Sequence, residues 1–245
     1  MSPEYGYHGT ILWIDLSARR YRLEARDQLF WRRYGGGGLA ATALLLEHTA
    51  AGIDPLGPEN LLIFASSVVA GHDAPGLARF TTAAKSPLTG GIGETRTEGP
   101  WGAALKASGA DILVFTGQAV RPTVVEIDRG TVSFHDAEHL WGRTVGETVD
   151  ALEGELGDDI HVAAIGPAGE HLVRYAAVVA ERCNLAARMG MGAVMGSKRL
   201  KAVVLRPGSQ PPIARPQALA ALREHFRQAI AGNALSRWQH DAPGF

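Results

Sequence analysis

The chain has 245 residues, 46% of them hydrophobic and 20% charged, and its formal net charge is -1. These values are typical of a globular protein and provide no global basic field that would attract nucleic acid. The sequence contains no apolar run near the roughly 20 residues of a membrane-spanning helix and no secretory signal at its start, so we expect a cytoplasmic protein without membrane or nucleic-acid partners.

The N-terminal half alternates short apolar runs with glycine-rich turns. Residues Gly9–Ala25 form two alternating runs around Ser17–Arg19, a pattern that predicts a β-hairpin. A short helix at 29–34 and a second at Leu39–His48, launched from Gly35–Gly38, are predicted next. Strands are then expected at 61–71, 79–87 and 111–117.

The second half continues with mixed strands and helices. A hairpin is predicted over Thr123–Ala137 with its turn at Asp128–Gly130, followed by an amphipathic helix at 144–157. Strands are expected at 161–166 and 199–208. Because hairpins are frequent and a regular βαβ rhythm is missing, the sequence predicts an α+β fold.

The composition changes after Gly208. Residues 209–216 are rich in proline and predict a linker, and 217–232 predict a helix with a mixed surface. We therefore predict a first domain at 1–208. Residues 209–245 would hold the linker and the first helix of a truncated helical domain, and a frayed C-terminus is the alternative.

Cysteine usage limits the redox chemistry of this chain. Cys183 is its one cysteine, which excludes an internal disulfide and a four-cysteine iron–sulfur site made by this chain alone. The nine histidines are scattered and lack the spacing of a zinc site.

Two glycine-rich segments carry the strongest functional signal. Residues Lys85–Gly117 contain seven glycines, and Gly190–Lys198 shows a similar pattern before its own run of small residues. Glycines let successive N–H groups converge on phosphate oxygens, and a following helix adds positive potential at its N-terminus. Tight packing is the alternative explanation for the same glycines.

Basic residues accompany both segments. Arg79 and Arg188 lie among apolar or small residues in the sequence, where a guanidinium group needs a phosphate or carboxylate partner. A structural ion pair with Glu94, Glu98 or Glu181 is the alternative to a phosphate. The nearby lysines are expected to be solvated or packed along their stems, namely Lys85, Lys106, Lys198 and Lys201.

The two segments also resemble each other. Arg79-Phe80 stands before the first and Arg174-Tyr175 before the second, each followed by small residues, glycines, a lysine and an apolar strand. In this alignment Lys201 answers Lys106. An internal repeat would let two related loops face one ligand from two sides, and chance similarity of two alanine- and glycine-rich stretches is the alternative.

A longer pattern is more specific than either loop. The chain contains, in order, GTILWIDLSARRYRLE, YGGGGLAATALLLEH, AKSPLTGGIG, ALKASGADILVFTG, DAEHLWGRTVGET and NLAARMGMGAVMGSKRLKAV. From about Gly9 to Val204 this resembles the N-terminal domain of the aldehyde ferredoxin oxidoreductase family, which are tungsten or molybdenum pterin enzymes. The AKSPLTG and GAVMGSK signatures are the most specific parts of the resemblance.

The resemblance implies a fold and an activity. The domain would be a base of mixed sheets folded on themselves, carrying a tungsten (or molybdenum) bis-molybdopterin. Helical C-terminal domains, or a complementary subunit, would cover the cofactor and supply the cysteines of a [4Fe–4S] cluster. Such an enzyme oxidises an aldehyde to a carboxylic acid and passes electrons to ferredoxin or a similar acceptor. Without that cover, exposed Leu185, Met189 and Trp101 would favour a homo-oligomer, although Trp101 is slightly more typical of a core residue.

The resemblance also assigns residues. Arg79 falls where the family directs an arginine at a cofactor phosphate, and the two pterin loops correspond to Arg96–Gly102 and Asn184–Gly190. Backbone carbonyls of Arg96 and Leu185 would hold a Mg²⁺ ion that bridges the pterin phosphates. No catalytic residue is assigned to this chain. The expected cofactor-binding residues are Arg79, Arg96, Thr97, Glu98, Gly99, Asn184, Leu185, Ala187, Arg188 and Gly190.

The loops depart from the family pattern. Arg96, Thr97 and Glu98 stand where the first loop usually has Asn or Cys followed by glycine, and Asn184 replaces an arginine in the second. Glu98 would repel phosphate unless it pairs with Arg96 or the metal. The alternative function is therefore a non-catalytic scaffold or phosphate-ligand binding module that keeps the fold without the activity. A nucleotide-phosphate binder is a third, weaker reading.

Overall fold

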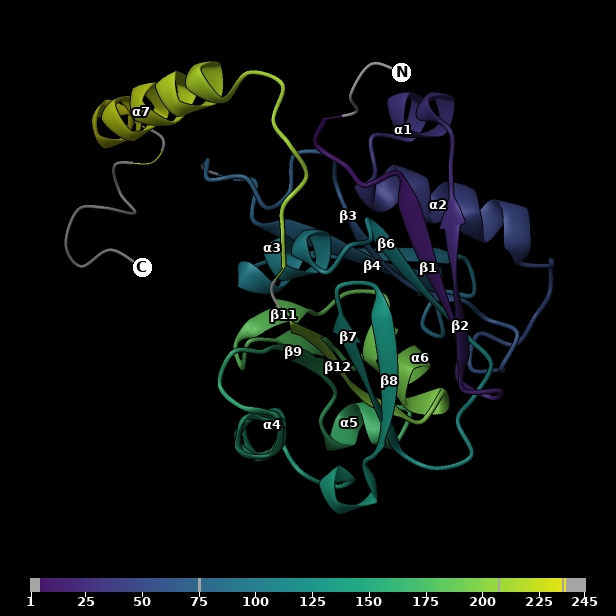
Figure 1. Cartoon of the computed structure of the whole chain (residues 1–245). Helices are drawn as coiled ribbons and strands as arrows, with labels where there is room; N and C mark the ends of the chain where they lie inside the picture. The colour runs from purple at the N-terminus through teal and green to yellow at the C-terminus, as the bar shows by residue number, and fades with distance from the viewer. Residues whose placement is uncertain (1–4, 75, 207, 235, 237–245) are drawn as a thin grey trace.

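The computed structural model describes residues 5–74, 76–206, 208–234 and 236. Two six-stranded mixed sheets face each other across a shared apolar core (Figure 1). Some helices lie on the outer sides of the sheets, whereas the short helices at 100–107 and 191–197 contact strands of both sheets. The predicted α+β class and the mixed sheets are confirmed.

The first sheet belongs to the N-terminal half. Its strands are β1 (Thr10–Asp15), β2 (Arg20–Ala25), β3 (Leu62–Ser66), β4 (Arg79–Lys85), β5 (Ile92–Glu98) and β6 (Ile112–Thr116), in the order β2-β1-β6-β3-β4-β5. Strand β1 pairs in parallel with β6, and all other neighbours are antiparallel. The helices α1 (Gln28–Tyr34) and α2 (Gly37–His48) pack on the outer face, where Trp31 and Leu44 meet Ile63.

The second sheet belongs to the C-terminal half. Its strands are β7 (Thr123–Asp128), β8 (Thr131–Asp136), β9 (His161–Ala164), β10 (Val178–Ala180), β11 (Asn184–Ala186) and β12 (Leu200–Arg206), in the order β11-β10-β9-β12-β7-β8. The helix α4 (Val145–Leu156) packs on its outer face through Val149 and Leu152. The remaining short helices are η1 (Glu138–Leu140), α3 (Pro100–Ala107), α5 (Pro167–Glu170) and α6 (Met191–Ser197).

The two sheets share one topology. In each half a hairpin comes first, its first strand pairs in parallel with the last strand of that half, and three antiparallel strands complete the sheet. The internal repeat therefore exists at the level of the fold. The residues that correspond between the two halves differ from the sequence expectation. Ile112 pairs with the second residue of β1 and Ala202 with the second residue of β7, so Ile112 and Ala202 are equivalent. Asp111, and not Lys106, is then the counterpart of Lys201.

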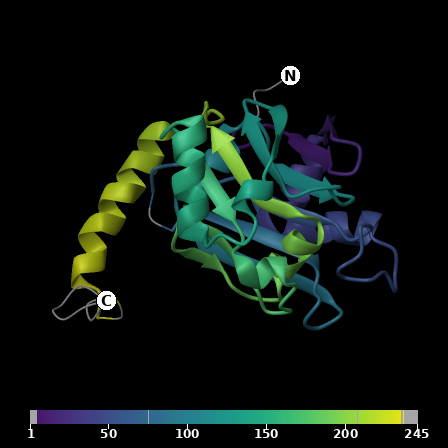
Figure 2. The same ribbon diagram turned by 90° about the horizontal axis from the view of Figure 1, so that it is seen from below.

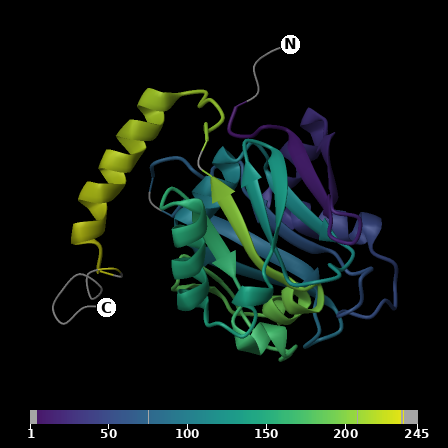
Figure 3. The same cartoon turned by 60° about the horizontal axis from the view of Figure 1, so that its bottom comes forward.

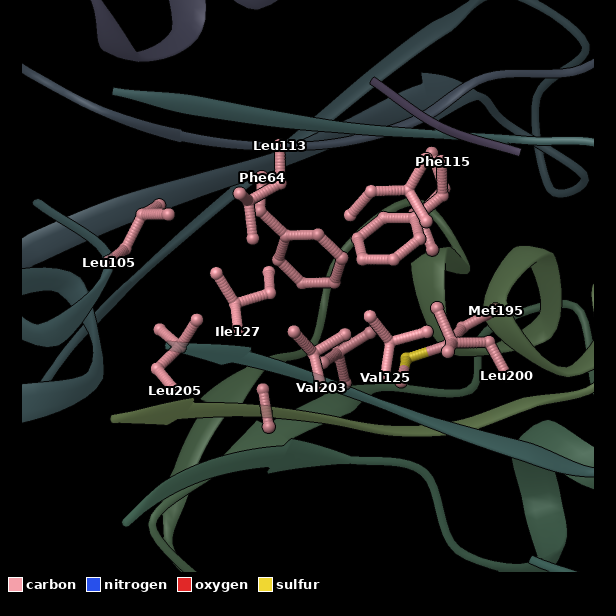
Figure 4. Packing of buried hydrophobic residues seen from close by; sticks show 14 of the residues in the cluster. Phe64, Leu105, Leu113, Phe115, Val125, Ile127, Met195, Leu200, Val203 and Leu205 are labelled. Atoms are coloured by element: carbon pink, nitrogen blue, oxygen red, sulfur yellow. The ribbon is translucent and has the colours of Figure 1, made fainter. Parts of the chain in front are cut away.

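The shared core lies between the sheets. Figure 4 shows Phe64, Leu113 and Phe115 of the first sheet pointing towards Val125 and Val203 of the second. Each of these large apolar side chains is fully buried, and burial of that kind contributes about 1.5–3 kcal/mol per side chain.

Trp101 of α3 belongs to this core. It is fully buried and its ring centroid lies 4.5 Å from that of Phe80. The expectation that Trp101 lies on a surface covered by a partner is therefore wrong, and the alternative of a core position is correct. Leu185 is exposed, and Met189 is partly buried.

Strands β5 and β11 were not predicted, since both lie in the expected loops, and no range was predicted for β10. The segment Ile92–Glu98 was expected to be part of a glycine-rich loop, whereas it forms the edge strand β5. Its buried positions are taken by Gly93, Thr95 and Thr97, so the inward side of this strand carries no large apolar residue.

The expectation of solvated or stem-packed lysines is wrong for three of the four. Lys106, Lys198 and Lys201 have fully buried side chains, and the ammonium groups of Lys106 and Lys201 are paired with carboxylates. Lys106 forms an ion pair with Asp111, and Lys201 donates to Glu170 at 2.5 Å. A buried ammonium keeps its charge only with such partners, because desolvation of the ion is costly.

Lys198 has weaker partners and is expected to make stability depend on pH. Its Nζ donates to the carbonyls of Gly117 (3.0 Å) and Pro58 (3.4 Å), and burial lowers its pKa from 10.5 to about 8, opposed by Glu59. Between these two values the unfolded chain binds more protons than the folded chain, so stability rises with pH. The difference between the two pKa values corresponds to about 3 kcal/mol in the free energy of unfolding, at 1.36 kcal/mol per pH unit.

Urea unfolding of the wild-type chain and of Lys198→Met from pH 7 to 10.5 checks this expectation. As pH rises above 8, the free energy of unfolding of the wild type should increase relative to that of the variant. The reason is that Lys198 becomes neutral in the folded wild type, which removes the desolvation cost of a buried charge. Parallel curves would contradict it.

Helix α7 (Pro216–Gly232) stands apart from both sheets in all three views (Figures 1, 2 and 3). It confirms the helix predicted at 217–232. Leu222 and Phe226 are exposed on it, and Arg223 forms an ion pair with Asp73. The boundary after Gly208 stays a prediction. No helix in the described part of the chain is long and apolar enough to cross a membrane.

Candidate functional site: a cradle between two edge strands

The two predicted loops, Arg96–Gly102 and Asn184–Gly190, lie against each other, and we call them together the cradle. Each begins on an edge strand, the first on β5 and the second on β11, at corresponding edges of the two sheets. The backbone N–H of Arg188 donates to Thr95 Oγ1 at 3.3 Å. A Cβ added to Gly99 would lie 2.4 Å from Nδ2 of Asn184, so the absence of a side chain at Gly99 lets the loops touch.

Arg96 and Leu185 occupy equivalent positions in the two halves. Starting from the second residue of each hairpin, strand pairing can be followed across each sheet to its edge. The first row is Ile11, Ile112, Ala65, Thr81 and Arg96, and the second row is Val124, Ala202, Ala164, Val179 and Leu185. The two residues expected to offer carbonyl oxygens are therefore related by the internal repeat. A ligand with two similar halves could meet similar backbone from both sides.

The AKSPLTG signature fixes the second loop to the first half of the chain. Ser86 Oγ donates to the carbonyl of Met189 at 2.8 Å, and Asn60 Nδ2 donates to the carbonyl of Lys85 at 3.0 Å. Gly93 lies under this contact, since a Cβ there would be 2.8 Å from Cβ of Met189. The AKSPLTG signature thus has a structural reason, because it positions the loop that follows β11.

Both loops lead into short helices without a capping side chain. Gly99 precedes α3 with a φ of 114°, and Gly190 precedes α6 with a φ of 76°. These positive values are unfavourable for other residues. Gly190 is also enclosed, because a Cβ there would lie 2.0 Å from the carbonyl oxygen of Arg174.

The arginines are more exposed than the sequence suggested. Arg79 and Arg188 were expected among apolar side chains, and both are exposed instead. Arg79 pairs with Glu98 on the neighbouring strand, and Arg96 donates to Glu94 at 2.5 Å. Arg79 therefore forms one of the ion pairs expected as the alternative, and its contact with a phosphate stays a prediction. Arg188 has no ionic partner among the described residues.

The remaining predicted residues differ in accessibility. Thr97 is buried on β5, Asn184 is half-buried, and Ala187 is exposed on the second loop. The described part of the chain contains no group of three acidic, histidine or cysteine side chains that could hold a metal ion. A cation held by these loops would rely on backbone oxygens and on the ligand, as hard cations such as Mg²⁺ allow.

A pocket beside the cradle was not identified from the sequence. It has a volume of about 330 Å³ and is lined by Arg79 and Arg96 together with Gly36–Gly38 and Thr81. The signal was present in the four consecutive glycines before a helix, which were read only as a helix start. A larger open pocket of about 630 Å³ between α1 and α2 contains none of the predicted residues.

Comparison with known proteins gives one consistent result. Residues 11–207 match the family model described as aldehyde ferredoxin oxidoreductase, N-terminal domain. The chain is 38% identical over 240 residues to the tungsten-containing aldehyde ferredoxin oxidoreductase of Thermococcus kodakarensis, covering 96% of this chain and 40% of that protein. It is 30% identical to the aliphatic sulfonate oxidoreductase WOR-like subunit of Pyrococcus furiosus, covering 98% and 41%.

A solved structure shows the same arrangement. The active site complex BamBC of benzoyl coenzyme A reductase matches with a TM-score of 0.89 and 33% identity, covering 94% of this chain and 36% of that chain. This chain thus spans about 40% of the length of the curated relatives it matches.

Proposed function

Because the chain belongs to the aldehyde ferredoxin oxidoreductase family, we propose that it is the cofactor-binding N-terminal portion of a tungsten or molybdenum pterin enzyme that oxidises aldehydes to carboxylic acids. Helical domains or a complementary subunit would cover the cofactor, supply the cysteines of a [4Fe–4S] cluster and pass electrons to ferredoxin or a similar acceptor. The cytoplasmic location and the homo-oligomer expected from the sequence remain predictions.

One observation carries this proposal. The carbonyl-bearing residues Arg96 and Leu185 are equivalent positions of two similar sheets whose edges meet. That arrangement suits a metal complex with two phosphate-bearing halves, joined through a Mg²⁺ ion that needs oxygen ligands. When bound, the bis-pterin metal group would supply the oxygen-transfer and two-electron chemistry.

The residues of this chain would bind and orient that group. Gly99 and Gly190 keep the backbone of both loops close and free of side chains, and Arg79 would contact a phosphate. The one cysteine, Cys183, is exposed and unpaired, so cluster cysteines would come from outside this chain. Thr97, Glu98, Asn184, Ala187 and Arg188 would complete the contact surface.

The fit is incomplete at one point. Glu98 already pairs with Arg79, so a phosphate would have to take over that guanidinium group. Both partners are more than half exposed, and exposed pairs of this kind contribute only about 0–1 kcal/mol. A dianionic phosphate can therefore replace the carboxylate.

The same ion pairs favour the second candidate, a non-catalytic module. In that case the carboxylates of Glu94 and Glu98 would neutralise Arg96 and Arg79 in place of cofactor phosphates. The fold would then serve as a scaffold or phosphate-ligand binder.

Metal analysis and pterin fluorescence distinguish the two functions. They are measured on the chain purified in the complex in which it occurs. We expect tungsten or molybdenum with pterin in that complex. An intact complex that contains neither metal nor pterin would overturn the enzyme proposal and leave the module.

Arg79→Ala is expected to lower the pterin content of that complex while changing the free energy of unfolding by less than about 1 kcal/mol, because its ion pair is exposed. The matched control is Arg227→Ala, which removes another exposed arginine of an ion pair, on α7. It should leave both quantities unchanged. Full pterin content in Arg79→Ala would remove the assigned role of Arg79.

A further inference from the structure

Strand β2 forms the edge of the first sheet at the end opposite the cradle (Figure 1). No residue that the structure describes pairs with its free side. The other three sheet edges have contacts, since β5 and β11 touch each other and Arg19 donates to the carbonyl oxygen of Phe134 on β8 at 2.6 Å. A free edge strand offers a row of unpaired N–H and C=O groups to another strand.

One hydrogen bond shows which groups of β2 point outwards. The N–H of Arg26 donates to the carbonyl oxygen of Gly9 at 2.9 Å, and these two residues continue the antiparallel register of β1 and β2. Hydrogen-bonded and non-hydrogen-bonded pairs alternate along such a register. Leu23 is three positions from Arg26, so it belongs to a non-hydrogen-bonded pair. The N–H and C=O groups of Tyr21, Leu23 and Ala25 therefore point away from β1.

The side chains of β2 are apolar on one face and charged on the other. Tyr21 and Leu23 are 45% and 54% exposed, and both lie on the sheet face that is directed towards the shared core. Charges on an edge strand commonly prevent pairing with another chain. On β2 the charges of the other face have both signs, because Arg20 and Arg22 are followed by Glu24. A strand with the complementary order of charges could therefore pair with it.

Charge complementarity identifies that strand as β2 of a second copy. When two identical strands pair antiparallel about a twofold axis, the residues with outward N–H groups lie opposite each other. Leu23 is the middle one of these residues, so it would face Leu23 of the second copy. Arg22 of each copy would then lie opposite Glu24 of the other. Opposite charges in facing positions stabilise a strand pair, and the dimer contains this pair twice.

The neighbouring registers are less favourable. A pairing centred on Arg22 would join Arg20 to Glu24, but it places Arg22 opposite itself in the middle of the interface. A pairing centred on Glu24 places that carboxylate opposite itself, and like charges in facing positions destabilise a strand pair. With Leu23 at the centre, the like-charged residues are Arg20 and Arg26 at the strand ends. Arg26 already has carboxylate partners in its own chain.

The charged side chains at this edge are available to a second copy. Arg22 pairs with Glu24 of its own strand at 2.6 Å, but 58% of the arginine side chain is exposed, and exposed pairs contribute little to stability. Arg20 has no ionic partner among the described residues. A pocket of about 440 Å³ lies beside them and is lined by Trp13, Arg20 and Arg22. The pocket gives room for side chains of the second copy.

We propose that two copies of this chain associate by antiparallel pairing of β2 with β2, centred on Leu23. The pairing continues the first sheet across the dimer with about six hydrogen bonds between the copies, and it packs Tyr21 of each copy on Ala25 of the other. The interface lies away from the cradle, so it involves neither Leu185 nor Met189 and does not depend on a cofactor.

Sedimentation velocity of the full 245-residue chain tests the dimer. Arg22→Glu should weaken dimerisation about tenfold, because repulsion replaces attraction at two symmetric positions. The matched control Arg20→Glu changes the net charge equally and should not weaken it, since it would face Arg26 of the second copy. The exchange Arg22→Glu/Glu24→Arg should restore the dimer. Equal weakening by both single variants, or a monomeric wild type at its highest soluble concentration, would overturn the proposal.

Disulfide trapping tests the register. In a Cys183→Ser background, Leu23→Cys would bring two thiols together on Cα atoms about 5.5 Å apart, within the range of a disulfide. In Arg22→Cys the two Cα atoms would be roughly 8 Å apart, which is too far. Both side chains are exposed, so neither change should disturb folding. Oxidised glutathione should therefore produce a covalent dimer of Leu23→Cys only. A covalent dimer of Arg22→Cys, or of neither variant, would contradict the proposed pairing and leave the pterin measurement unaffected.

Discussion

Gly190→Ala is expected to lower the free energy of unfolding by about 2–5 kcal/mol, the sum of an overpacked site and a left-handed backbone. The added Cβ would lie 2.0 Å from the carbonyl oxygen of Arg174, which is backbone and cannot turn aside. The φ of Gly190 is 76°, a value that alanine adopts only with strain. Because Gly190 starts α6 at the end of the second loop, the loop should also lose its contact with Ser86.

Chemical unfolding of Gly190→Ala and Gly146→Ala measures this effect. Gly146 lies in α4 with nothing within 4 Å of an added Cβ, so alanine there should be neutral or stabilise by up to about 1 kcal/mol. If both variants unfolded like the wild type, the described path of the second loop would be incorrect.

Asp111→Ala is expected to cost about 3–5 kcal/mol, because it leaves a buried charge without its partner. The Asp111 carboxylate accepts from the backbone N–H groups of His8 (3.0 Å), Gly9 (2.8 Å) and Thr10 (3.2 Å), and it pairs with Lys106. Both charged side chains are fully inaccessible to solvent. One carboxylate therefore joins the chain start to α3 and β6.

Lys106→Met is the matched comparison and should cost less, since Asp111 keeps its three N–H donors. The two variants should also differ in pH dependence. Burial lowers the pKa of Lys106, and Asp111 opposes that shift. Without Asp111 the pKa falls further, so the unfolded chain binds more protons over a wider range. The stability deficit of Asp111→Ala should then shrink as pH rises, and a deficit independent of pH would contradict this account.

Most elements could be predicted because their buried faces are apolar and regular. The hairpin turn at Asp128–Gly130 and the helix at 217–232 agree with the structure. Strand β5 was missed because its inward residues are glycine and threonine, which lack the apolar alternation that marks a strand. These small residues are the reason why Ile92–Glu98 was expected to be a loop.

The candidate site was predictable in part. Glycine content and the family signature indicated both loops, but their mutual contact joins residues far apart in the sequence, since Thr95 and Arg188 are 93 positions apart. The partners of the buried lysines were not predictable for the same reason, since Lys201 meets Glu170 only through the packing of α5 on α6. The pairing of Arg79 with Glu98 follows from the register of β4 and β5, which required the missed strand.

The central claim is that the edges of two related sheets hold one cation-bridged, doubly phosphorylated ligand. Crystals of the cofactor-loaded complex prepared with Mn²⁺ in place of Mg²⁺ test it most directly, because manganese scatters anomalously. We predict a manganese peak in contact with the carbonyl oxygens of both Arg96 and Leu185. A cofactor-loaded complex whose manganese lies away from either residue would contradict the account.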